Sequence, residues 1–77
     1  MKNNSFKKVD APIINADGNI FNLMGISSKA LKENEYDEEA KEMIDRIQKS
    51  HSYDEALSII TEYINPVDIN QYEDMRI

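Results

Sequence analysis

The most apolar stretch of the sequence, residues 16–31, constrains the fold more than any other feature. It opens with Asp17-Gly18-Asn19, a turn composition in which Asp17 or Asn19 can cap a helix and Gly18 tolerates a positive φ. Apolar residues follow at helical spacings on more than one face, which predicts a helix over residues 20–33 that is buried on most sides. We expect two further, more charged helices to pack onto it.

One glycine, Gly25, lies inside this expected helix, where glycine costs roughly 1 kcal/mol relative to alanine. With Ser27 and Ser28 nearby, it forms a narrow strip on which another backbone can come close. The first interpretation is tight helix–helix packing inside the monomer. The alternative is a groove or a dimer seam.

A second helix is predicted over residues 38–49, with Asp37 as its cap. Four apolar residues follow the i, i+3, i+4, i+7 period that indicates an amphipathic helix: Ala40, Met43, Ile44 and Ile47. Three acidic residues each precede a basic residue by four positions and predict ion pairs along the outer face: Asp37–Lys41, Glu42–Arg46 and Asp45–Lys49.

A third helix is predicted over residues 53–64. Ser52 and Glu55 form the Ser-x-x-Glu pattern of a capping box, and Pro66 disfavours helix at Asn65. One face carries the apolar side chains Ala56, Leu57, Ile60, Tyr63 and Ile64.

The two ends of the chain are expected to be extended or loose. Residues 9–14 favour a strand that Pro12 confines to an edge, and residues 67–69 are a possible partner for it. Residues 1–8 are expected to fray, and residues 67–77 to form a polar tail that packs as a strap or stays loose. The predicted fold class is mainly α, a single small three-helix domain over residues 1–77 with short extended N- and C-terminal segments.

Composition excludes several kinds of site. The sequence has no cysteine and a single histidine, so disulfides, thiolate zinc sites and histidine-rich metal sites are excluded, and we expect no metal and no cofactor. Asn15, Asp17 and Asn19 imitate the start of a calcium loop, but Ile26 stands where a bidentate glutamate is required. With no signal peptide or membrane span in the sequence, we expect a cytoplasmic protein that does not bind membranes.

Charge is distributed unevenly along the chain. Residues 1–32 carry a net charge of +3 and residues 33–77 a net charge of −9, which together give the formal net charge of −6. Because acidic surfaces repel phosphate backbones, direct nucleic-acid binding is not expected. His51 lies in a predicted turn away from any nucleophile and orienting acid, and the two glycines form no phosphate loop. We therefore expect that the protein is not an enzyme.

Three segments in this order resemble a group of small uncharacterised proteins that phages and integrative mobile elements of gut Firmicutes encode. They are Asp17-Gly18-Asn19-Ile20-Phe21-Asn22-Leu23-Met24-Gly25, then Ala30-Leu31-Lys32, then Ser52-Tyr53-Asp54-Glu55-Ala56-Leu57. The resemblance covers residues 13–67, and Ser50-His51-Ser52 stands where the group has a glycine-containing turn. It implies a small accessory protein of a mobile element. Proteins in this setting include inhibitors of host defence, of the anti-CRISPR kind.

The leading functional hypothesis is a non-enzymatic protein that binds a host or element-encoded protein with a basic surface. The acidic residues would steer the encounter, and aromatic anchors would supply most of the affinity. The predicted partner-binding residues are Phe21, Glu35, Tyr36, Asp37, Glu38, Glu39 and Glu42. A homo-oligomer that encloses a nucleotide-like signal is the first alternative, with ligand-binding residues Asp17, Gly18, Asn19 and Gly25. A self-assembling structural protein is the second.

Overall fold

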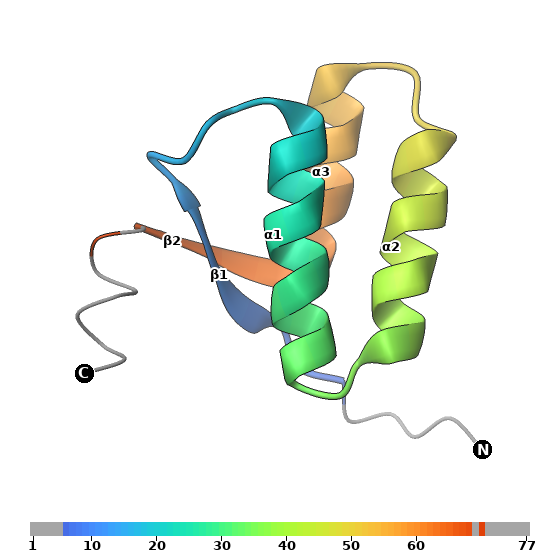
Figure 1. The fold of residues 1–77 in the computed structure, drawn as a ribbon. Helices are drawn as coiled ribbons and strands as arrows, with labels where there is room; N and C mark the ends of the chain where they lie inside the picture. The colour runs from blue at the N-terminus through green and yellow to red at the C-terminus, as the bar shows by residue number, and fades with distance from the viewer. Residues whose placement is uncertain (1–5, 69, 71–77) are drawn as a thin grey trace.

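The computed structural model describes residues 6–68 and residue 70 of the chain. Three helices and two strands follow one another in the order β1 (Val9–Ile14), α1 (Ile20–Glu33), α2 (Asp37–Gln48), α3 (Tyr53–Tyr63) and β2 (Ile64–Asp68) (Figure 1). The expected small, mainly helical domain is therefore present, with a small parallel sheet added to it. The predicted fraying of residues 1–8 falls largely outside the described residues, as does most of the predicted tail.

The two strands lie side by side in a parallel pair (Figure 1), with Val9 opposite Ile64 and Ala11 opposite Pro66. Pro66 is tolerated because both strands of a two-stranded sheet are edges, so its missing N–H can face away from the partner. The strand over residues 9–14 is as predicted, but its partner begins at Ile64 rather than Val67. Ile69, the last residue of the predicted partner strand, lies outside the described residues.

The third helix ends at Tyr63, one residue earlier than predicted. Ile64 has extended backbone angles, φ −133° and ψ 158°, and its side chain is fully buried. Pro66 favours an extended conformation at Asn65, the residue before it. Ile64 is extended as well, because it pairs with Val9 and its side chain is buried in the core.

The turn between α1 and α2 differs from its prediction. Glu35 has a positive φ of 68°, and the Tyr36 N–H donates to the Leu31 carbonyl, which closes α1 tightly. The second helix therefore begins at Asp37, with Tyr36 in the cap position and no side-chain cap hydrogen bond. The prediction that Asp37 is the cap is wrong. Gly18 does not use the positive φ that it tolerates, whereas the non-glycine residues Asn15 and Glu35 have positive φ.

The predicted caps of α1 and α3 are confirmed, with one change in detail. Asn19 Oδ1 accepts from the Phe21 N–H at 2.8 Å, and Ser52 Oγ accepts from the Glu55 N–H at 3.0 Å. The Glu55 carboxylate accepts from the N–H of His51 at 2.9 Å, rather than from that of Ser52 as a capping box requires.

The hydrophobic core lies between the helices and the sheet. It comprises Ala11, Ile13, Leu23, Ala30, Leu31, Ala40, Met43, Ile47, Ala56, Ile59, Ile60, Tyr63 and Ile64. α1 is covered on one side only, so the expectation that it is buried on most sides is wrong: Phe21 is 73% exposed. Gly25 is exposed as well, and an added Cβ would meet no atom within 4 Å, which overturns tight packing at Gly25 inside the monomer.

Between α2 and α3, Arg46 forms a different ion pair from the one predicted. The Asp45–Lys49 pair is present at 3.1 Å, as the spacing predicted. Arg46, however, donates to both carboxylate oxygens of Glu62, at 2.6 and 3.2 Å, and to the Tyr63 hydroxyl at 3.1 Å. A bidentate carboxylate on a neighbouring helix holds the guanidinium better than Glu42 one turn away on its own helix.

Candidate functional site

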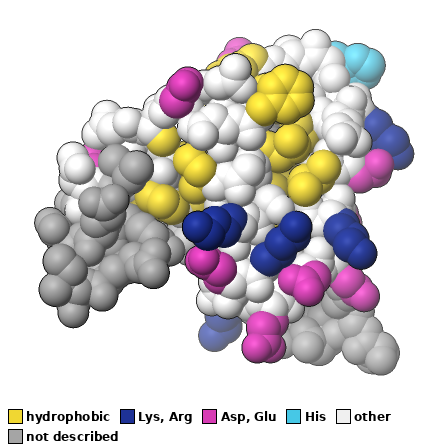
Figure 2. Space-filling model, in the orientation of Figure 1, with side chains coloured by type: hydrophobic (Ala, Val, Ile, Leu, Met, Phe, Trp, Pro, Cys, Tyr) yellow, Lys and Arg dark blue, Asp and Glu magenta, His cyan; other side chains and the backbone are white. Residues whose placement is uncertain are grey.

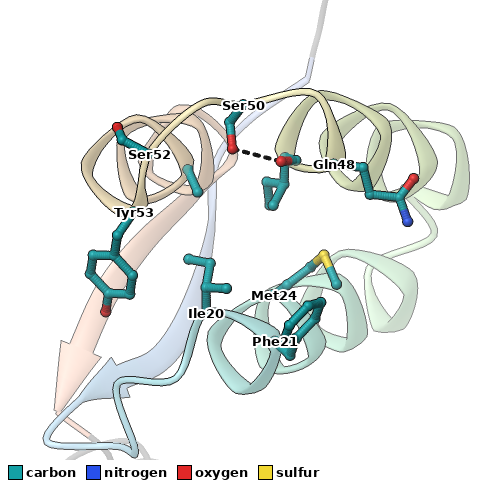
Figure 3. A pocket seen from close by; sticks show the side chains of 9 residues that line it. Ile20, Phe21, Met24, Gln48, Ser50, Ser52 and Tyr53 are labelled. Atoms are coloured by element: carbon teal, nitrogen blue, oxygen red, sulfur yellow. Dashed lines mark hydrogen bonds between the residues drawn. The ribbon is translucent and has the colours of Figure 1, made fainter.

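An apolar groove of about 410 Å³ lies where the start of α1, the end of α2 and the start of α3 meet. Its lining comprises Ile20, Phe21, Met24, Ile47, Gln48, Ser50, Ser52, Tyr53 and Ala56. Figure 3 shows Ile20 and Met24 of α1 facing the connection between α2 and α3, with Tyr53 at the other side of the groove. We call this region the Phe21 end of the molecule.

The two aromatic side chains of the groove are open to solvent. Phe21 is 73% exposed and Tyr53 is 47% exposed, although large apolar side chains are usually buried in a domain of this kind. Figure 2 shows hydrophobic side chains gathered on this face of the molecule, with basic and acidic side chains below them. A cluster of exposed apolar side chains beside a hollow is typical of an interaction surface.

Polar groups around the groove are held by bonds within the protein. Ser50 Oγ donates to the Ile47 carbonyl at 2.6 Å, and Ser52 Oγ caps α3. The Tyr53 hydroxyl donates to the Gly18 carbonyl at 2.5 Å, which fastens α3 to the turn before α1. A ligand bound in the groove would therefore contact mainly apolar side chains.

The predicted acidic residues lie at the other end of the bundle, which we call the Tyr36 end. Glu35 is exposed in the α1–α2 connection, and Asp37, Glu38 and Glu39 lie in the first turn of α2. Since α1 has 14 residues, this end lies about 20 Å from Phe21 along the helix axis. The fold thus separates the predicted partner-binding residues into two surfaces.

Tyr36 is half-buried and packs with other aromatic side chains. The Phe6 ring lies edge-on to it, with centroids 4.7 Å apart, and lies 6.1 Å from the Tyr63 ring in a similar orientation. Glu42, one turn further along α2, faces the Tyr63 hydroxyl. At this end the aromatic groups stabilise the fold, whereas Phe21 at the opposite end projects into solvent.

The residues predicted for a small ligand are only partly brought together. Asp17, Gly18 and Asn19 form one turn, in which Asp17 Oδ1 accepts from the Asn19 N–H at 3.0 Å. The Asn19 side chain caps α1 and the Gly18 carbonyl accepts from Tyr53, so these polar groups already have partners. Gly25 lies on α1 in a second groove of about 580 Å³, which is lined by Met24, Gly25, Ser28, Lys29, Lys32, Glu33 and Ile44.

Sequence reasoning selected Phe21 but missed the residues that surround it. Ile47 and Tyr53 come from other helices, and their proximity to Phe21 depends on how the helices pack. One signal was available in the sequence: at 100° per residue, Phe21 shares a helix face with Gly25 and Lys32. A phenylalanine on a face with a lysine and a glycine is expected to point outward.

Shifted pKa values occur between α2 and α3, outside the groove. The bidentate bond from Arg46 lowers the pKa of the Glu62 carboxyl and raises that of Arg46 itself. Burial raises the pKa of the Tyr63 hydroxyl, against a smaller opposing effect of the Arg46 bond. These groups hold two helices together, and their titration bears on stability.

Residues 6–68 and residue 70 contain neither a metal-binding cluster nor a membrane-spanning helix. Within this part of the chain, no cluster of three or more histidine or acidic side chains is arranged to hold a metal ion. Likewise, no helix among the described residues has the length and apolar character needed to cross a membrane.

Comparison with known proteins found no relative of this chain. No family model, no curated protein and no solved structure matches the chain.

Proposed function

We propose that the protein is a non-enzymatic binding protein that holds another protein against the apolar groove at its Phe21 end. The observation that carries this proposal is the 73% exposure of Phe21 beside that groove. Interfaces derive most of their affinity from a few anchors, enriched in aromatic residues, that become buried in a well-packed pocket. Burying a phenylalanine side chain removes apolar area worth about 1.5–3 kcal/mol from water.

The acidic residues of the Tyr36 end are proposed to act separately, by steering a partner with a basic surface. Charges act on association over roughly a Debye length, about 10 Å at 0.1 M salt. Glu35 and Asp37 lie about 20 Å from Phe21 along the axis and Glu42, midway along α2, about 12 Å, so they do not form a charged rim for the groove. We therefore assign affinity to the Phe21 end and the rate of encounter to Glu35, Asp37 and Glu42.

The biological setting is part of the same proposal and rests on the resemblance to proteins of phages and mobile elements. In that setting the partner is a protein of the host or of the element. Inhibition of host defence is the activity we would test first.

A photo-crosslinking experiment tests the proposal directly. The photoreactive residue p-benzoylphenylalanine replaces Phe21 in one variant and the exposed residue Ser58 in a matched control. Irradiation in producing cells should give a defined protein adduct from position 21 and none from position 58, and mass spectrometry would identify it. An excess of unlabelled protein should suppress the adduct, and an excess of Phe21→Ala should not. Equal adducts from both positions, or none from position 21, would refute the proposal.

A further inference from the structure

We propose that the partner of the Phe21 surface is a second copy of this chain, seated antiparallel on the exposed face of α1. The inference rests on the proposed function, because it names what covers that same surface, whereas the acidic residues of the Tyr36 end keep their proposed role toward a separate protein with a basic surface. Three observations carry it: a protruding side chain, a gap one helical turn away, and charges whose spacing matches across a two-fold axis.

The exposed face of α1 carries both a projection and a gap. Phe21 projects into solvent, and one turn further on Gly25 leaves open space, since no atom lies within 4 Å of an added Cβ. Ser28 comes next along α1 but is only 7% exposed, so it lies at the base of the second groove, which both residues line with Met24 and Ile44. An isologous interface requires a single patch with both a projection and a complementary hollow, and this face has both.

An antiparallel pairing brings the two features together twice. If Phe21 of one copy lies over Gly25 and Ser28 of the other, the two-fold axis repeats the same contact in reverse. A helix without a side chain at Gly25 allows the second copy to approach closely. The exposed phenylalanine of each copy is then covered by the other, which removes the largest apolar exposure described in the monomer.

The same register pairs opposite charges. Lys32 follows Phe21 by eleven residues, and Asp17 precedes Ser28 by the same number. With Phe21 over Ser28 of the second copy, Lys32 lies about 16 Å beyond Phe21 along the axis, at the end where the Asp17 turn of the second copy leads into its α1. Both residues are exposed, and two bonds fix the Asp17 turn to the start of α1: the Asn19 N–H donates to Asp17 Oδ1, and Asn22 Nδ2 donates to the Asp17 carbonyl.

A contact between two short helices covers less than the roughly 800 Å² per partner of a standard interface. We therefore expect a weak dimer. In this arrangement the groove beside Phe21 is partly covered, and the acidic residues of the Tyr36 end stay outside the contact.

Analytical ultracentrifugation of the full chain, from 1 µM to 1 mM in low salt, tests the inference. The wild type should form dimers, and Phe21→Ala should raise the dimer Kd by about 100-fold. Asp17→Lys or Lys32→Asp alone should raise it by about tenfold, through repulsion at both ends. An equimolar mixture of these two variants should form a heterodimer tighter than either homodimer, because each position 17 then faces the opposite charge at position 32: one pair in the original orientation and one reversed.

Several results would overturn the inference. A wild type that stays monomeric to 1 mM, a dimer indifferent to Phe21→Ala, or a variant mixture without a tighter heterodimer would each do so. If Asp17→Lys fails to fold by circular dichroism, Asp17→Asn keeps the side-chain oxygen that accepts from Asn19, and Lys32→Gln matches it. Each should then weaken the dimer and reduce its salt dependence, and unchanged salt dependence would contradict the proposed pairing.

The crosslinking experiment separates this inference from the proposed function. An adduct between two copies through position 21 supports both. An adduct with a different protein, together with a monomeric wild type, retains the proposed function and eliminates the second copy as the partner.

Discussion

The two ends of the helical bundle use aromatic side chains in opposite ways. At the Tyr36 end, Phe6 packs edge-on against both Tyr36 and Tyr63 beside the core. At the Phe21 end, Phe21 and Tyr53 are open to solvent beside an apolar groove. The charges follow the reverse pattern, since exposed acidic residues surround the end whose aromatic groups are packed. An aromatic residue therefore marks a binding surface only where the packing leaves it uncovered.

This difference changes how the predicted binding residues are understood. The sequence suggested one surface that combines an aromatic anchor with an acidic edge. Because α1 and α2 are antiparallel, Phe21 lies at one end of helices that are about 20 Å long and the residues from Glu35 to Glu39 at the other, with Glu42 midway along α2. Affinity and steering are thus open to separate tests.

The largest expected effect comes from comparing a core residue of α1 with Phe21. Leu31 is fully buried, so Leu31→Ala should lower the free energy of unfolding by about 2–5 kcal/mol. Phe21→Ala should change it by less than about 0.5 kcal/mol, because the side chain is already in water. Urea denaturation followed by circular dichroism measures both. A large loss of stability in Phe21→Ala would mean that the residue belongs to the fold rather than to a binding surface.

A second substitution tests the aromatic packing of the Tyr36 end. Phe6→Ala removes a half-buried ring and its edge contacts with Tyr36 and Tyr63, so we expect a loss of about 1–3 kcal/mol. Phe6→Leu is the matched control and should lose less, because it keeps most of the apolar contact without the ring. Equal stability of Phe6→Ala and the wild type in urea denaturation would remove the contrast between the two ends.

Local sequence signals predicted the helices well, and they failed where distant partners decide the structure. The helix over residues 20–33 has its predicted bounds, because its start is set by the adjacent cap Asn19 and its length by the apolar period inside it. Strand β2 begins earlier than predicted, since the conformation of Ile64 depends on Val9 near the other end of the described chain. The groove was missed for the same reason: Ile47 and Tyr53 reach Phe21 only through the packing of three helices.

A third prediction concerns the bond that fixes the turn at the Phe21 end. Tyr53→Phe removes the hydroxyl that donates to the Gly18 carbonyl and should cost about 1 kcal/mol. Tyr53→Ala also removes the ring from the groove and should cost more. Thermal unfolding measures both, and hydrogen exchange at Asn19 and Phe21 should quicken in each variant. A Tyr53→Phe variant with unchanged unfolding and exchange would show that this bond does not hold the turn.

A fourth prediction has the opposite sign. Gly25→Ala should raise the stability of the monomer by about 0.5–1 kcal/mol, because alanine restricts the unfolded chain and the added Cβ has free space. Gly18→Ala is the comparison, and its Cβ would lie 3.4 Å from the Tyr53 hydroxyl oxygen, so we expect a smaller gain there or none. Measurement at low micromolar concentration isolates the monomer. A destabilised Gly25→Ala would mean that the space beside Gly25 is filled within the fold.

The smallest expected effect is a dependence of stability on pH, and it arises from the contacts between α2 and α3. Arg46 lowers the pKa of the exposed Glu62 carboxyl below its ordinary value of 4.5, so this pair stabilises the folded state above pH 4.5. The contribution is lost as the pH falls through the lowered pKa. Burial raises the pKa of Tyr63 above 10.0, so its contribution is present below pH 10 and is lost as the pH rises through the raised pKa.

Two variants separate the acidic and the alkaline contributions in thermal unfolding. Arg46→Gln should be less stable than the wild type near neutral pH, and the difference in Tm should shrink as the pH falls below 4.5, where Glu62 becomes protonated in both proteins. Tyr63→Phe should remove part of the loss of stability above pH 10, since phenylalanine has no proton to release. Phe21→Ala should follow the wild type through both ranges, because Phe21 carries no titratable group and lies at the other end of the bundle. If Arg46→Gln kept the same difference in Tm from pH 7 to pH 3, the bond to Glu62 would not be the cause of its lower stability.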